Sequence, residues 1–101
     1  MAKTSSVQKN LRRKNLIEKF AAKRQELKDI MDNPSASVEE RYAARFALSA
    51  LPRNSRPTRF RNRCYLTGRS RAFYRKFGVS RITLRELVSN GLVPGVIKAS
   101  W

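Results

Sequence analysis

The chain has 101 residues, of which 23 are Lys or Arg and only 7 are Asp or Glu, so its formal net charge at pH 7 is +16 and its sequence pI is about 11.5. An apolar fraction of 41% in so short a chain allows only a small core, and domains of this size have a narrow margin of stability. No apolar run approaches the roughly 20 residues that cross a bilayer, the first residues lack the apolar stretch of a secretory signal, and a single cysteine excludes an internal disulfide, so a cytoplasmic protein is expected.

The first predicted element is a long N-terminal helix over about residues 6–31. This stretch has no Gly or Pro, and its apolar residues keep a loose helical spacing. Because the apolar stripe is narrow, the helix should not be stable alone in water, and we expect it to lie along RNA or another protein. The alternative is a helix whose charged faces are simply solvated.

A second helix is predicted to begin after the turn residues at 32–35. Ser37 and Glu40 have the spacing of a capping box, and Pro52 should end the helix. Small alanines at several positions would let it pack closely. Its expected buried face consists of Tyr42, Phe46, Leu48 and Leu51.

The next segment, residues 52–58, is polar and contains two prolines, so an extended basic arm is predicted. A tight turn is expected at Gly68, with a short hairpin whose return includes residues 72–74. Ser80 should cap a third helix that runs through Asn90, with Gly91 following it, and an extended tail ends the chain. The predicted fold is therefore mainly α with irregular extended segments, divided into a helical extension (1–52) and a basic arm with a compact module (53–101).

The most informative feature is the segment from Arg53 to Arg85, which has eleven basic residues, ten of them Arg, and no acid. Such unpaired like charge is most stable against phosphates, and the planar guanidinium of Arg both grips phosphate bidentately and stacks on bases. The segment therefore predicts an RNA-binding surface. The predicted contacts are Arg53, Arg56, Arg59, Arg61, Arg63, Arg69, Arg71, Arg75, Lys76, Arg81 and Arg85, with Lys98 and Trp101 in the tail.

Two roles are possible for the aromatic residues among these cations. Phe73, Tyr74 and Phe77 could stack on bases, but in a chain of this size we expect them to belong to the core. Trp101 stands at the terminus, so docking on RNA or on a neighbouring protein is favoured for it.

The sequence gives little support for catalysis or cofactor binding. The chain has no His, no glycine-rich phosphate loop and no nucleophile with a recognisable base, so a non-enzymatic protein is expected. Residues 64, 67, 80 and 83 have the spacing of a two-knuckle zinc ribbon, but Cys64 is joined there by Thr67, Ser80 and Thr83, and neutral hydroxyls are poor zinc ligands. No metal is expected, and a reactive Cys64 is the less favoured alternative to a buried structural thiol.

Five motifs in order carry a resemblance to a known family: RNRC (61–64), TGR (67–69), RKFGVSR (75–81), LREL (84–87) and PGVIKASW (94–101). They resemble the family of small-subunit ribosomal protein fourteen. The likeness covers the whole chain, because MAK (1–3), AAKRQELK (21–28) and LPRNS (51–55) resemble the longer bacterial form.

The resemblance implies a structural role in the head of the small ribosomal subunit. It implies binding to small-subunit rRNA, support of subunit assembly and shaping of the RNA near the decoding A site, with small-subunit proteins three, ten and nineteen as neighbours. Shorter members of the family carry a four-cysteine zinc ribbon, so Thr67, Ser80 and Thr83 imply the zinc-independent branch. The alternatives are a free-standing basic nucleic-acid-binding or RNA-chaperone protein and, in third place, an enzyme that uses Cys64.

Overall fold

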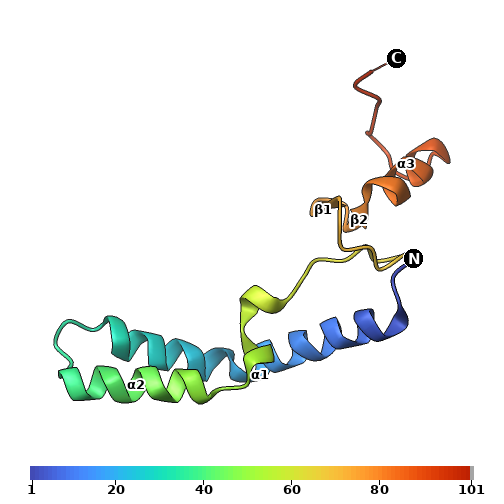
Figure 1. Cartoon of the computed structure of the whole chain (residues 1–101). Helices are drawn as coiled ribbons and strands as arrows, with labels where there is room; N and C mark the ends of the chain where they lie inside the picture. The colour runs from blue at the N-terminus through green and yellow to red at the C-terminus, as the bar shows by residue number, and fades with distance from the viewer. Residues whose placement is uncertain (101) are drawn as a thin grey trace. The chain divides into compact units, whose positions relative to one another are not determined.

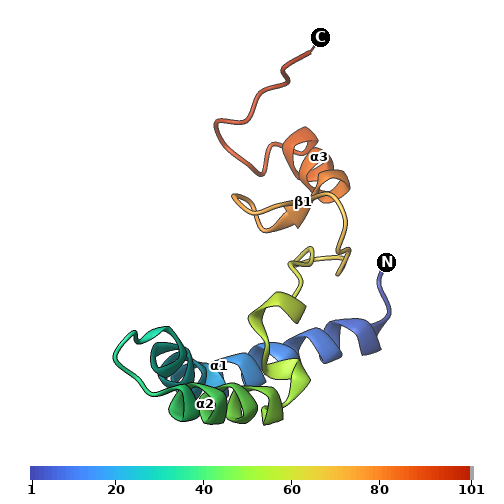
Figure 2. The ribbon, with the colours of Figure 1, turned by 60° about the vertical axis from the view of Figure 1, so that its left-hand side comes forward.

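The computed structural model describes residues 1–100, which form two compact units (Figures 1 and 2). One unit comprises residues 8–60, and the other comprises residues 1–7 together with the chain from residue 61 onward. Within the described residues there are three α-helices, two 3-10 helices and one two-stranded antiparallel ladder, so the prediction of a mainly helical protein is confirmed. Trp101, a predicted contact, lies outside the described residues.

Helices α1 (Thr4–Asp32) and α2 (Val38–Ala50) supply most of the unit of residues 8–60, and α2 runs back alongside α1 in both views (Figures 1 and 2). The predicted capping box is present. Ser37 Oγ accepts a hydrogen bond from the Glu40 N–H at 3.2 Å, and Glu40 Oε2 accepts one from the Ser37 N–H at 3.3 Å. These reciprocal bonds satisfy two donors at the start of α2, which explains why the helix begins there.

The buried face of α2 is not the predicted one. Tyr42 is 56% exposed and Phe46 is 73% exposed, whereas Ala44 and Leu51 are buried and Leu48 is half-buried. Positions 44 and 48 are four residues apart and so share one face of the helix, and Leu51 follows α2 as its C-cap. The prediction for Tyr42 and Phe46 was wrong, because the face with the small side chain of Ala44 is the one that turns inward.

The segment expected as an extended arm contains two 3-10 helices, η1 (Arg53–Ser55) and η2 (Pro57–Arg59). Pro57 is tolerated at the first position of η2 because its missing N–H has no partner there in any case. Ser55 is 0% exposed and binds the guanidinium of Arg24, which is also buried. This buried contact explains the deviation from an extended arm, because it ties the segment to α1 within the same unit.

In the second unit a short hairpin leads into the last helix. Strand β1 (Phe73–Tyr74) pairs with β2 (Val79–Ser80), with Phe73 opposite Ser80. The turn of the hairpin was predicted at Gly68, but it lies at residues 75–78. Gly78, with φ +69°, completes this turn. The pairing therefore uses a later turn, while Gly68 closes a separate loop.

Helix α3 (Arg81–Ser89) begins and ends as the sequence predicted. Ser80 Oγ accepts a hydrogen bond from the Thr83 N–H at 3.4 Å at its start. At its end the Gly91 N–H donates to Val88 O and the Leu92 N–H donates to Leu87 O, both at 3.0 Å, which is the Schellman pattern that glycine favours. None of the described helices is both long enough and apolar enough to span a membrane.

Candidate nucleic-acid interface

The loop of residues 64–69 forms the centre of the second unit's candidate site. The Cys64 N–H donates to Arg69 O at 2.8 Å, and the Gly68 N–H donates to Cys64 O at 2.9 Å. Gly68 has φ +75°, and a Cβ there would lie 2.9 Å from Val7 Cγ2. Glycine is thus required both for the backbone conformation and for the close approach of the N-terminal residues, where the Ala2 N–H donates to Thr67 O at 3.2 Å.

The four side chains with zinc-ribbon spacing meet beside this loop. Cys64 Sγ lies 3.4 Å from Thr83 Oγ1, and the Ser80 hydroxyl donates to Thr83 Oγ1 at 3.2 Å. Burial raises the pKa of the Cys64 thiol, but hydrogen bonds from the Thr67 and Thr83 hydroxyls and from the backbone N–H groups of Ser80 and Thr67 outweigh it and lower this pKa to about 5. The cluster therefore stabilises a buried thiolate through hydrogen bonds alone.

These residues do not fit a zinc ion. Structural zinc is held by four thiolate or imidazole ligands, and here one thiol is accompanied by three hydroxyls that hydrogen-bond within the cluster. Over residues 1–100 no group of three or more His, Cys, Asp or Glu side chains is placed to hold a metal ion. The chemistry of the donor set thus favours a hydrogen-bonded cluster over a metal centre.

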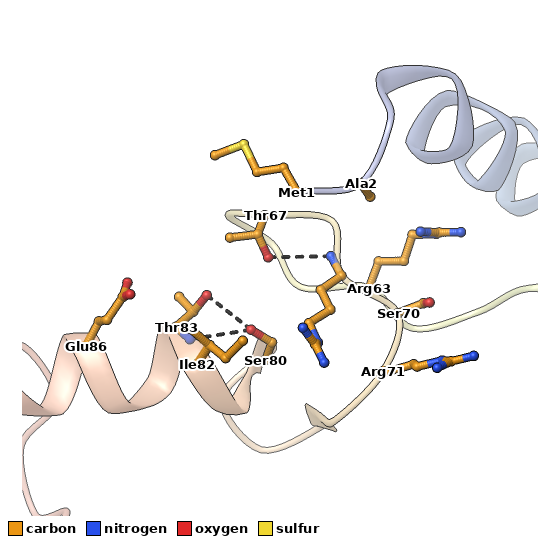
Figure 3. Close-up of a pocket in the computed structure, with 11 residues that line it drawn as sticks. Met1, Ala2, Arg63, Thr67, Ser70, Arg71, Ser80, Ile82, Thr83 and Glu86 are labelled. Atoms are coloured by element: carbon orange, nitrogen blue, oxygen red, sulfur yellow. Dashed lines mark hydrogen bonds between the residues drawn. The ribbon is translucent and has the colours of Figure 1, made fainter.

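A basic cavity of about 540 Å³ adjoins this cluster (Figure 3). Figure 3 shows Arg63 and Arg71 on one side and Glu86 on the α3 side. Arg69 also lines the cavity, so the lining has three basic side chains and one acidic side chain. The guanidinium of Arg63 donates to Gly68 O at 3.0 Å, but its Nε and that of Arg69 are shielded from solvent without a hydrogen-bond partner within the part of the chain that the structure describes. An anion such as a phosphate oxygen would meet this surplus of donors.

The remaining predicted contacts project into solvent. All of them within residues 1–100 are exposed except Arg63 and Arg69, which are half-buried. The structure does not gather them into one unit, because Arg53, Arg56 and Arg59 belong to the unit of residues 8–60 and the others to the second unit. The exposed residues are Arg53, Arg56, Arg59, Arg61, Arg71, Arg75, Lys76, Arg81, Arg85 and Lys98.

Helix α3 presents Arg81 and Arg85 on an exposed face, four residues apart. Leu84, Leu87 and Val88 are half-buried, so the apolar side of the helix is turned away from these two cations. A rigid helix whose positive N-terminal end lies next to Arg81 suits the binding of phosphate.

The aromatic residues divide by exposure. Phe73 and Phe77 are half-buried, and the ammonium group of Lys76 lies 5.7 Å from the centroid of the Phe77 ring. Tyr74 is exposed, contrary to the expectation that it belongs to the core. Tyr65 is 88% exposed in the turn after Cys64, a position that makes it available for base stacking.

Comparison with known proteins identifies the class first. A family model described as ribosomal protein S14p/S29e matches residues 47–100, so the basic segment and α3 are those of a ribosomal protein. Proteins named small ribosomal subunit protein uS14 from Maricaulis maris, Methylorubrum extorquens and Novosphingobium aromaticivorans are 55%, 56% and 56% identical to this chain, in each case over 101 residues and the full length of both proteins. The chain belongs to the uS14 family, and the resemblance drawn from its motifs is confirmed.

Proposed function

We propose that this protein is a structural constituent of the small ribosomal subunit that binds small-subunit rRNA, in the cytoplasm and on the ribosome. The observation that carries the proposal is the acid-free segment of residues 53–85, in which every basic residue except Arg63 and Arg69 is exposed. Membership of the uS14 family supports the same role and agrees with a protein that is not an enzyme.

The finer parts of the proposal concern place and partners. The protein belongs to the subunit head, supports assembly and shapes the rRNA near the decoding A site, beside small-subunit proteins three, ten and nineteen. Residues 53–101 make most of the RNA contacts, including those of Lys98 and Trp101, and residues 1–52 form a helical extension. The hydroxyls at positions 67, 80 and 83 support a zinc-independent form, because they make a poor donor set for that ion.

The face of α3 offers the sharpest test. Replacing Arg81 and Arg85 with Glu reverses two exposed charges without removing a buried side chain, so the helix should remain folded while the variant is outcompeted by wild type during incorporation into small subunits. Incorporation is measured by mixing labelled wild type and variant in reconstituted subunits and sedimenting them at moderate salt. Lys19→Glu and Lys23→Glu together serve as a control that makes the same change of charge on exposed positions of α1.

Two outcomes would contradict the proposal. Assembly of the Arg81 and Arg85 variant at wild-type efficiency would show that the α3 face is only solvated. A wild-type protein that leaves small subunits at moderate salt and follows bulk DNA would instead be a free-standing nucleic-acid-binding protein, whose binding is mainly non-specific.

A further inference from the structure

The unit of residues 8–60 contains a second basic cavity, of about 410 Å³. Every residue that lines it is polar, and none is acidic. Three of its four cations lie outside the segment of residues 53–85. The lining residues are Lys9, Arg12 and Arg13 from α1, and Asn54 and Arg59 from the 3-10 segment.

Local structure explains how these cations meet. Lys9, Arg12 and Arg13 have relative positions i, i+3 and i+4, so they share one face of α1. Arg59 ends η2, which lies beside α1 in both views (Figures 1 and 2). The cavity is therefore built from two segments that are far apart in the sequence.

A buried contact holds the second segment in place. The Arg24 guanidinium donates from Nε to Ser55 O at 3.1 Å and from Nη2 to Ser55 Oγ at 2.6 Å. Both side chains are buried, so these bonds are shielded from competing water. Asn54, which precedes Ser55, and Arg59 are thereby presented to α1 before any ligand arrives, which lowers the entropic cost of binding.

The cavity has more donors and positive charge than the described protein itself satisfies. Four cations converge there without an acid in the lining, so they repel one another. The Nε of Arg13 is shielded from solvent and has no hydrogen-bond partner among residues 1–100. An unsatisfied buried donor is costly, and an anion that accepts from it would remove both this cost and the repulsion.

We propose that the cavity of Lys9, Arg12, Arg13 and Arg59 binds two adjacent phosphates of the RNA backbone. The guanidinium groups can grip phosphate oxygens bidentately, and the Asn54 amide can donate to a phosphate or to a ribose hydroxyl. RNA is favoured over an acidic protein segment because no apolar side chain lines the cavity to anchor a peptide. The inference rests on the proposed function for its ligand, and it extends the RNA-binding surface to α1, for which the sequence predicts contact with RNA or another protein.

The test compares two triple variants of the full-length protein for binding to a transcript of the small-subunit rRNA head domain. K9Q/R12Q/R13Q removes three of the four cavity cations, and K14Q/K19Q/K23Q removes three exposed cations of α1 outside the cavity. Gln has a helix propensity similar to those of Lys and Arg, so α1 should be preserved in both. Circular dichroism checks the helix content.

The expected result is a selective loss of salt dependence. Two lost phosphate contacts should reduce the slope of log K against log salt by about 1.4, at about 0.7 for each phosphate of a single strand. The affinity of K9Q/R12Q/R13Q for the transcript should fall by at least about tenfold at low salt. For K14Q/K19Q/K23Q, the reduction in slope should be less than half of that for K9Q/R12Q/R13Q.

Equal losses in the two triple variants would overturn the inference, because the α1 cations would then act only through net charge. Steep salt dependence of the wild type in that same experiment would leave the proposed function intact, whereas a wild-type slope near zero would contradict the proposed function itself. If polyglutamate binds as tightly as the transcript and with the same dependence on Lys9, Arg12 and Arg13, the site is one for an acidic protein instead.

A second variant, on the opposite wall of the cavity, tests the same site even if the triple variant folds poorly. R59Q should show a non-additive effect when combined with R12Q, since the two cations line the same cavity. R56Q, whose residue does not line the cavity, should be additive with R12Q. Additivity of R59Q with R12Q would contradict a single site built by both walls of the cavity.

Discussion

Single residues of the second unit show how hydrogen bonds surround one buried thiol. Cys64 is 3% exposed, yet its thiolate is favoured because hydroxyl and backbone donors surround it. Thr83 contacts both Cys64 and Ser80, so one hydroxyl links the loop of residues 64–69 to the start of α3. The cluster thus joins the loop to the helix through directional hydrogen bonds.

The ionisation of Cys64 predicts a pH dependence. Its pKa falls from 9.0 to about 5 on folding, so the thiolate contributes stability that is complete above pH 9, decreases as the pH falls, and is lost when the pH falls through about 5. The difference in free energy of unfolding between wild type and C64A should therefore grow from about pH 5 upward. T83V should raise the pKa, as followed by the ultraviolet absorbance of the thiolate. A thiolate that forms only near pH 9 in the folded protein would disprove this assignment.

Replacing Gly68 with Ala should cost stability through a steric clash, and the same replacement at Gly78 serves as the control without a clash. G68A should destabilise the second unit, because it combines positive φ with a Cβ only 2.9 Å from Val7 Cγ2 and 3.2 Å from Ala2 Cβ. G78A is the matched control, since φ is +69° there and no atom lies within 4 Å of the added Cβ. We expect G78A to cost about 1–2 kcal/mol from the backbone alone and G68A to cost more, as measured by denaturant unfolding. Equal costs would show that the N-terminal residues move aside freely.

At the scale of elements, local capping places the helix ends and buried polar contacts place the segments between them. Ser37 and Ser80 cap α2 and α3, and Gly91 ends α3. By contrast, η1 is held by the Arg24 guanidinium, which no neighbour in the sequence supplies. The unit of residues 8–60 therefore combines a buried polar bridge with a small apolar core.

Removal of this bridge should be costly. R24M leaves the carbonyl and hydroxyl groups of buried Ser55 without their guanidinium partner, so the free energy of unfolding should fall by about 1–3 kcal/mol. K23M, at the neighbouring exposed position of the same helix, should change it by less than about 0.5 kcal/mol. Thermal or urea unfolding gives both values. If R24M and K23M unfold alike, the bridge contributes no net stability.

The whole molecule has a charge that its own acids cannot balance. With 23 basic residues and 7 acids, the free protein is destabilised by repulsion among its own charges, and bound phosphates remove this repulsion. Both units take part, because each has a cavity with a surplus of cations. The stability of the protein is therefore linked to the polyanion that it binds.

This linkage predicts that tripolyphosphate raises the melting temperature of the free protein by several degrees more than sodium chloride at the same ionic strength. The reason is that a multivalent anion occupies clustered cations, whereas chloride only screens them. K9Q/R12Q/R13Q should reduce the gain, and K14Q/K19Q/K23Q should reduce it less. An equal effect of the two salts would mean that screening alone accounts for the stabilisation.

Sequence alone determined the features that depend on neighbouring residues and on composition. The charge surplus of residues 53–85, the cap of α2 at Ser37, the cap of α3 at Ser80 and the ordered motifs of the uS14 family are all readable in the chain, because each involves residues within a few positions of one another or a simple count. Tertiary structure alone decided which segments meet. It turned Ala44 inward in place of Tyr42 and Phe46, moved the hairpin turn to residues 75–78, and brought Arg59 to the cations of α1. Contacts between distant residues depend on shape and burial across the folded unit, and local periodicity does not encode them.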